Sequence, residues 1–264
     1  MVTAWVSRIQ IFPIKALDAM RLEQARILAT GALEFDRTWA MFDANGKPVS
    51  GKRHATVHRL RSTIDLASQT ISICAGERPP SAGPAYSLEH DREAIERLLG
   101  GYFGFPIELR KNSDLGFPDD TVSPGPTIIS VATLEEIARW FSLPFEQVRA
   151  RFRTNIEIDG VPPFWEDRLF GPPDTAIRFA IGDAVLEGIN PCQRCIIPTR
   201  DPLSGVEDKT FVQRLTELRK QSRPPWSERS RFNHFYRVAI NTRPSGDQGG
   251  KIIRDGDTIH ILGS

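Results

Sequence analysis

The sequence predicts a mainly β protein of the α+β class, with a barrel-like architecture and a few short helices. Short stretches in which apolar and polar residues alternate recur along the chain, and this alternation is typical of strands with one buried face. Turn signals rich in Gly, Asn, Asp and Pro separate the stretches, whereas segments with helical spacing are few. Many short strands joined by turns indicate a barrel or a sandwich.

The first part of the chain, residues 1–75, is predicted to form an N-terminal β-barrel-like module. Pro13 suits the end of a strand, because proline has no N–H for a central ladder position. Asn45-Gly46 follows an alternating apolar run and predicts a hairpin turn. Alternation predicts strands at residues 6–11, 24–28, 37–42, 60–66 and 70–73.

An irregular and helical connection is predicted over residues 76–126. Helical spacing indicates one helix at residues 91–99, and Gly100-Gly101 is expected to end it. Residues 112–126 show no regular pattern, and we expect them to form a long irregular segment.

The C-terminal domain is predicted to span residues 127–264. Thr133 and Glu136 match a capping box, so we expect a helix to begin at Thr133. Two further helices are predicted at residues 145–148 and 210–220. The strands are predicted at residues 127–130, 152–158, 176–181, 184–187 and 236–240, with a closing pair at 251–253 and 258–261.

Composition excludes several classes of protein. The 264 residues are 40% hydrophobic and carry a formal net charge of +1, so we expect neither a nucleic-acid partner nor a membrane span. Three cysteines fit a reducing compartment better than a disulfide scaffold. With no basic and apolar leader at the N-terminus, a cytoplasmic location is expected. Pyridoxal phosphate is not predicted.

Cys192 and Cys195 form a Cys-x-x-Cys pair that is open to four interpretations. A zinc site needs four ligands, and a thioredoxin-like pair opens a helix, whereas the following residues 196–198 resemble a strand. The pair also fits two small buried residues. The fourth interpretation is a single thiolate at Cys195, acting as ligand or nucleophile, which a positive charge at Arg194 would favour.

Basic residues at separated positions could converge on an anion. Lys15 stands at a predicted strand end and Arg37 follows Asp36, while Arg151 and Arg153 would share one face of a strand. Guanidinium groups hold phosphates through paired hydrogen bonds. Taken singly, each is more often a surface residue. The acidic pair at 166–167 could orient such arginines or belong to an ordinary loop.

The order and spacing of seven motifs resemble the MOSC superfamily, named after the C-terminal domain of molybdenum cofactor sulfurase. The sequence otherwise lacks nucleotide-binding glycine motifs, a nucleophile elbow and a four-cysteine iron–sulfur set. If the protein is a redox enzyme, we therefore expect its electrons to come from another protein. The motifs lie at residues 12–15, 35–39, 151–156, 164–167, 192–195, 201–205 and 215–219.

The resemblance implies a β-barrel that binds the molybdenum cofactor, molybdopterin with Mo. The better-known members are the mitochondrial amidoxime-reducing components and bacterial relatives, which reduce N-hydroxylated compounds. By this resemblance Cys195 is the catalytic thiolate ligand of the metal, and Cys192 is a packing residue. The residues implied to contact the cofactor are Lys15, Arg37, Thr121, Ser123, Arg153, Asn155 and Arg194.

The resemblance implies an oxidoreductase that depends on the molybdenum cofactor and reduces N-hydroxylated or related oxygenated small molecules. A separate protein would donate the electrons. Two positions depart from the reductases: Ala16 stands where they usually place Ser, and Gln193 stands between the cysteines. One alternative is a module that carries the cofactor or activated sulfur without turnover. Another is a protein without molybdenum whose cysteine pair is structural.

Overall fold

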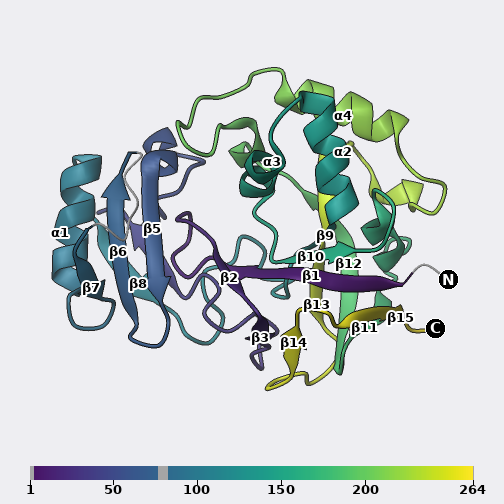
Figure 1. Cartoon of the computed structure of the whole chain (residues 1–264), viewed down its shortest axis with the longest axis horizontal. Coiled ribbons are helices and arrows are strands. Elements are labelled where there is room, and N and C mark those ends of the chain that lie inside the picture. The colour runs from purple at the N-terminus through teal and green to yellow at the C-terminus, as the bar shows by residue number, and fades with distance from the viewer. Residues whose placement is uncertain (1–2, 77–82, 264) are drawn as a thin grey trace.

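The computed structural model describes residues 3–76 and 83–263 (Figure 1). Its strands confirm the predicted mainly β fold, because they form one closed barrel and three small sheets. The barrel has seven strands. An eighth strand, β2 (Met20–Leu22), pairs with residues 9–11 at the end of β1 (Ala4–Ile11). In barrel order the strands are β10 (Ile156–Asp159), β9 (Ile128–Ser130), β13 (Arg237–Pro244), β12 (Ala184–Gln193), β11 (Ile177–Ile181), β15 (Thr258–Ile261) and β1.

Strand β1 closes this barrel. Ala4 and Trp5 pair with β15 on one side, while Trp5 to Ile9 pair with β10 on the other side. The register shifts between Val6 and Arg8, which indicates a β-bulge that bends the strand. The first strand of the chain therefore belongs to the same sheet as the last one. The domain boundaries predicted at residues 75 and 127 stay a prediction.

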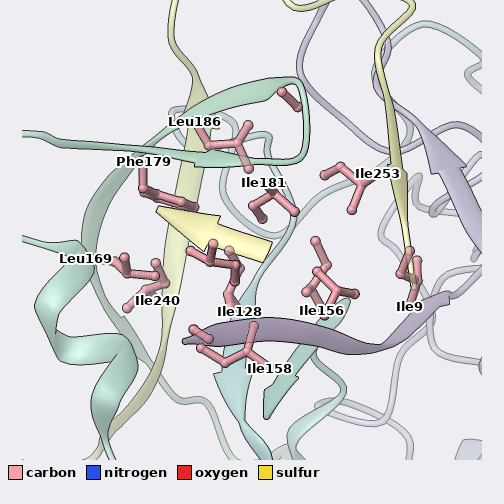
Figure 2. Close-up of a cluster of buried hydrophobic side chains, with 14 of the residues drawn as sticks. Ile9, Ile128, Ile156, Ile158, Leu169, Phe179, Ile181, Leu186, Ile240 and Ile253 are labelled. Atoms are coloured by element: carbon pink, nitrogen blue, oxygen red, sulfur yellow. The ribbon is translucent and has the colours of Figure 1, made fainter. Parts of the chain in front are cut away.

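The inside of the barrel is filled by aliphatic and aromatic side chains. Figure 2 shows Ile9, Ile128, Ile156 and Phe179 pointing toward one another from different strands. All four are fully buried. Side chains of a strand alternate between its two faces, so Ile128 faces this core while the next residue faces outward.

Three helices cover the outer face of β9 and β13. They are α2 (Val131–Phe141), α3 (Phe145–Phe152) and α4 (Phe211–Gln221). Ile129 and Val238 pack against Leu134 and Phe211 in a second buried cluster. Because both faces of β9 are buried, its sequence is a continuous apolar run rather than an alternating one.

A smaller module lies beside the barrel, at the left of Figure 1. Its core is formed by buried side chains such as Trp39, Met41, Ile71 and Leu99. Residues 77–82 of the predicted connection lie outside the described ranges. The module contains β4 (Trp39–Phe42), β5 (Leu60–Asp65), β6 (Thr70–Ala75), β7 (Ala85–Ser87), α1 (Arg92–Phe103) and β8 (Glu108–Lys111). No helix within the described ranges combines the length and apolar character that a bilayer span requires.

Two predicted helix boundaries were wrong. Helix α1 continues through Gly100-Gly101 and ends at Gly104, whose φ of 76° is the left-handed conformation that favours glycine. Helix α2 is capped by Ser130, whose hydroxyl accepts the Thr133 N–H at 3.1 Å. Thr133 instead lies inside the helix, and its own hydroxyl donates to Glu166.

Three strand predictions were also wrong. Arg151 belongs to helix α3, so it shares no strand face with Arg153. The predicted closing pair does not exist, because β14 (Ile252–Arg254) pairs with β3 (Gln24–Arg26) and β15 pairs with β11 and β1. The residues after Cys195 form a short 3₁₀ turn, Ile197–Thr199, rather than a strand.

The acidic pair Glu166 and Asp167 lies in a buried polar cluster under helix α4. Asp167 accepts a hydrogen bond from Arg219, which is 1% exposed and lies 4.0 Å over the ring of Phe164. Glu166 is fully buried and accepts the Thr133 hydroxyl at 3.1 Å. Burial, followed by the charge of Asp167, raises the pKa of Glu166 to about 7. Asp167 therefore orients Arg219, not Arg151 or Arg153.

Replacement of Glu166 by Gln should change how stability depends on pH. The ordinary pKa of this glutamate is 4.5 and its folded value is about 7. Between these values the folded protein holds a proton that the unfolded chain has released, so the free energy of unfolding falls as pH rises. Glu166→Gln keeps the acceptor for Thr133 without the charge. We expect the free energy of unfolding of the variant, relative to that of wild type, to increase by roughly 2–3 kcal/mol from pH 5 to pH 8.

Urea denaturation at several pH values measures this difference. Subtracting the wild-type curve from the variant curve removes the contributions of the other titrating groups. Parallel curves for the two proteins would contradict the assignment of Glu166.

Candidate functional site

A cleft of about 850 Å³ opens where the barrel meets the smaller module. Arg8, Gln10 and Phe12, at the end of β1 and just beyond it, contribute to its wall, and Arg237 and Asn241 contribute from β13. Loops complete it. The remaining lining comes mainly from segments within residues 15–19, 32–37, 50–61, 115–127, 146–155 and 190–202.

The structure brings every site residue implied by the resemblance to this cleft. Arg151, predicted to share the anion with Arg153, lies outside the lining and donates to the Pro198 carbonyl at 2.8 Å. The implied site residues come from positions as far apart in the chain as Lys15 and Cys195, so only the folded topology unites them. Their convergence agrees with the resemblance, whose residue assignments stay predictions. The lining includes Lys15, Arg37, Thr121, Ser123, Arg153, Asn155, Arg194 and Cys195.

Cys195 follows the end of β12 on a loop held by Tyr236. The Tyr236 hydroxyl donates to the Cys195 carbonyl at 3.0 Å, and the Tyr236 carbonyl accepts the Arg194 N–H at 3.2 Å. The Cys195 Sγ accepts the Ile197 N–H at 3.5 Å and is half-buried. Burial raises the pKa of Tyr236, so its hydroxyl stays a donor. The thiol is thus presented on a fixed loop.

The guanidinium of Arg194 contacts Cys192, whereas the sequence predicts a charge that acts on Cys195. Its Nη1 donates to the Cys192 Sγ at 3.2 Å, and its Nη2 donates to the Phe152 carbonyl. The guanidinium also lies over the Phe152 ring, 5.3 Å from the centroid. The expectation that Arg194 acts directly on Cys195 is therefore corrected: its charge faces Cys192, because residues 192 and 194 share one side of the strand end.

Arg37 and Arg153 form a pair of cations around Phe12. Their guanidinium carbons lie 5.2 Å and 4.1 Å from the ring centroid. Burial, followed by the charge of Arg37, lowers the pKa of Arg153 to about 10. Asp36 pairs with Arg37, whereas Arg153 donates to the Leu17 carbonyl at 2.7 Å. Two half-buried cations in one wall of the cleft favour an anionic ligand.

The backbone around the two arginines is in an uncommon conformation. Arg37 and Arg153 have φ values of 52° and 51°, and Ala16 and Phe35 also lie in the left-handed region. Such conformations cost free energy for residues other than glycine and cluster at functional sites. The neighbouring packing must hold these residues in place. The Arg37 N–H, for example, donates to the Phe12 carbonyl at 2.9 Å.

The segment of residues 117–126, here called the strap, lies over one side of the cleft. Ser123 is 7% exposed, and its hydroxyl oxygen is buried without a hydrogen-bond partner among the described residues. A buried polar atom without a partner is costly, so a ligand acceptor or donor would satisfy it. Thr121 is exposed on the same strap.

Asn155 serves mainly to join the strands around the cleft. Its amide oxygen accepts from the N–H and the hydroxyl of Thr127 at 3.2 Å and 3.1 Å. Its amide nitrogen donates to the Gln10 carbonyl at 3.2 Å. An amide nitrogen has two donors, which leaves one for a ligand.

Several residues of the lining were not singled out from the sequence. Lys52 and His58 line the cleft from the smaller module. Tyr236, just before β13, lies outside the lining and acts through its hydrogen bond to the Cys195 carbonyl. Burial, followed by the charges of Arg153 and Arg200, lowers the pKa of His58 to about 4, so this imidazole is neutral near pH 7. No local motif marks these positions, because their roles depend on contacts between distant segments.

The described residues hold no group of three or more His, Cys, Asp or Glu side chains that could bind a metal ion.

Comparison with known families matches both parts of the chain. Residues 3–99 match the family described as the MOSC N-terminal beta barrel domain. Residues 127–260 match the family described as the MOSC domain. These matches agree with the resemblance derived from the seven motifs.

Curated relatives fall into two groups. Molybdenum cofactor sulfurase of Caenorhabditis elegans is 29% identical over 96 residues, which cover 36% of this chain and 13% of the relative. The Homo sapiens sulfurase is 22% identical over 261 residues, covering 81% and 28%. The chain therefore spans less than a third of these sulfurases. Mitochondrial amidoxime-reducing component 1 of Homo sapiens is 22% identical over 297 residues, covering 98% and 83%.

Removal of the Tyr236 hydroxyl should loosen the cysteine loop. Loss of one hydrogen bond of about 1 kcal/mol raises the population of open loop states about fivefold. We expect Tyr236→Phe to raise the alkylation rate of Cys195 by iodoacetamide about fivefold, without changing that of Cys74. Peptide mass spectrometry of each cysteine measures these rates.

Tyr102→Phe is the matched control for this experiment. Tyr102 also donates to a backbone carbonyl, that of Thr56 at 2.8 Å, but in the smaller module. Its loss should leave the Cys195 rate unchanged. Equal Cys195 rates in Tyr236→Phe and wild type would show that the hydroxyl does not fix the loop.

Proposed function

The chain belongs to the MOSC domain family, and from this premise we propose that it binds the molybdenum cofactor in the cleft. We further propose that it reduces N-hydroxylated or related oxygenated small molecules. A separate donor protein supplies the electrons. The Cys195 thiolate is the proposed ligand of the metal.

One observation carries this proposal: a half-buried thiol and a set of cations line the same cleft. Cys195 supplies the thiol, and Lys15, Arg37 and Arg153 supply the cations. A soft thiolate suits a metal that the dithiolene sulfurs of a pterin already hold. Ammonium and guanidinium groups suit the phosphate of the same cofactor. The two kinds of group thus match the two ends of one ligand.

Three features of the cleft support binding of this cofactor independently of the family match. The Ser123 hydroxyl is buried without a partner among the described residues and needs a polar ligand atom. Arg153 is half-buried beside a second cation, and an anion would relieve that repulsion. The cleft volume of about 850 Å³ lies in the range of small-molecule and cofactor sites.

Each residue has a distinct task in the proposed reaction. When bound, the molybdenum centre supplies the two-electron chemistry that removes oxygen from the substrate. Cys195 holds the metal, and Tyr236 fixes the loop that presents Cys195. Arg37, Arg153 and Lys15 would bind the phosphate and so orient the pterin. His58, neutral near pH 7, adds no positive charge to this wall.

The amidoxime-reducing relative supports the proposed substrate class, because it aligns with nearly the whole of this chain. The sulfurase relatives favour a second candidate, in which the protein binds or delivers the cofactor or its sulfur without turnover. That candidate predicts bound cofactor, or a persulfide on Cys195, but no reduction of a hydroxylamine by an artificial electron donor.

The cofactor content of the purified protein tests the proposal. From a host that makes the molybdenum cofactor, we expect molybdenum and pterin in nearly equal amounts with the protein. Elemental mass spectrometry and pterin fluorescence measure the two. Absence of both from folded protein would reject the proposal, whereas cofactor without hydroxylamine reduction would favour the second candidate.

Cys195→Ala should lower the molybdenum content about tenfold or more, because the metal loses its protein ligand. Cys192→Ala is the matched control, since the same side chain is removed three residues away in the same cleft lining. It should keep its molybdenum. Full molybdenum content in Cys195→Ala would reject the ligand assignment while leaving cofactor binding in place.

A further inference from the structure

We propose that the Asp119 carboxylate of the strap occupies an anion subsite formed by Lys15 and Lys52, and that a phosphate group of the ligand displaces it. Lys52 is therefore a further anion-binding residue, contributed by the smaller module. The identity of the ligand rests on the proposed function; the subsite itself does not.

The three side chains meet at one point from three separate parts of the chain. The Lys15 Nζ lies 3.0 Å from the Asp119 Oδ1, and the Lys52 Nζ lies 3.3 Å from the same oxygen. Lys15 follows β1, Lys52 follows β4, and Asp119 lies between β8 and β9. All three line the cleft. Two ammonium groups thus share one carboxylate oxygen.

The charges at this point do not cancel. Two lysines face one aspartate, and the nearby Arg37 is paired with its own Asp36. Partial burial alone would raise the pKa of Asp119, but the charges of Lys15 and Lys52 hold it well below its ordinary value. The carboxylate is therefore ionised near pH 7, and the group of three keeps a net charge of about +1.

The strap is anchored on both sides of Asp119 by backbone hydrogen bonds. The Phe117 N–H donates to the Arg37 carbonyl, and the Gly125 N–H donates to the Thr242 carbonyl, each at 2.9 Å. Asp119 itself extends between these anchors with 59% of its side chain exposed. Its carboxylate can swing into water while both anchors stay in place.

A phosphate group suits the two lysines better than Asp119 does. An ion pair with an exposed partner is weak, because water screens it. A phosphate near pH 7 carries more negative charge than a carboxylate and offers more acceptor oxygens. Lys15, being only 14% exposed, would gain most from this exchange. In the cofactor-free protein Asp119 is thus the internal anion that keeps the lysines paired.

Binding of inorganic phosphate to the cofactor-free protein tests this subsite. Dissociation constants come from NMR titration of backbone amides at constant ionic strength. We expect Asp119→Asn to bind phosphate about three- to tenfold more tightly than wild type, because the competing anion is gone. Lys52→Gln should bind it about three- to tenfold more weakly, because one cation is lost.

Two neighbouring residues provide matched controls. Asp43→Asn removes the same charge from an ion pair with Arg53, and Arg53→Gln removes a charge next to Lys52. Neither residue lines the cleft. Both variants should bind phosphate within about twofold of wild type. Amide shifts should be largest near residues 15, 52 and 119.

Two results would overturn the inference. Unchanged or weaker phosphate binding by Asp119→Asn would show that its carboxylate does not compete. Absence of phosphate binding in wild type and in Asp119→Asn alike would show that the two lysines form no anion subsite. Failure of the proposed function appears separately, as protein that lacks molybdenum and pterin while these phosphate affinities still hold.

Discussion

Closure of the barrel by β1 determines where every part of the cleft lies. Its backbone groups need partners on both sides, and β10 and β15 supply them. The chain must then leave the barrel at Ile11. Phe12 and Lys15 therefore lie near the start of β10, which follows Arg153 in the chain. The smaller module is built after this exit and packs over the same end (Figure 1). Residues from both ends of the chain therefore share one cavity.

The charge of the cleft follows from this arrangement. Cations arrive from separate elements, and their acidic partners neutralise only some of them: Arg37 has Asp36, whereas Lys15 and Lys52 share Asp119. Arg153 is half-buried with a carbonyl as its partner. Burial of such groups is unfavourable unless an opposite charge compensates. A ligand with an anionic group would supply that compensation, and the left-handed backbone at both arginines is consistent with a site built for it.

Sequence patterns predicted the elements whose stability is local. Strands β5 and β6 and helix α4 each carry their own periodicity, and β9 is a continuous apolar run; the strands and the helix predicted at these positions were confirmed. Long-range partners were not predictable in this way. Arg194 donates to the Cys192 Sγ and to the Phe152 carbonyl, and Phe152 lies 42 residues away in the chain. The sequence indicated Thr133 as the helix cap. Instead, Ser130 caps the helix, and the Thr133 hydroxyl donates a hydrogen bond to Glu166. Charge and motif patterns singled out Lys15, Arg37, Arg153 and Cys195, whereas Thr121, Ser123 and Asn155 could be predicted only through the family resemblance.

The central claim is that one cleft holds a molybdenum centre against Cys195. The most direct measurement is a crystal structure of the protein from a cofactor-competent host, with anomalous data collected at the molybdenum absorption edge. We expect one strong anomalous peak within bonding distance of the Cys195 Sγ, with continuous density that leads from it toward Arg37 and Arg153. A peak away from Cys195, or no peak in a folded protein prepared from that host, would contradict it.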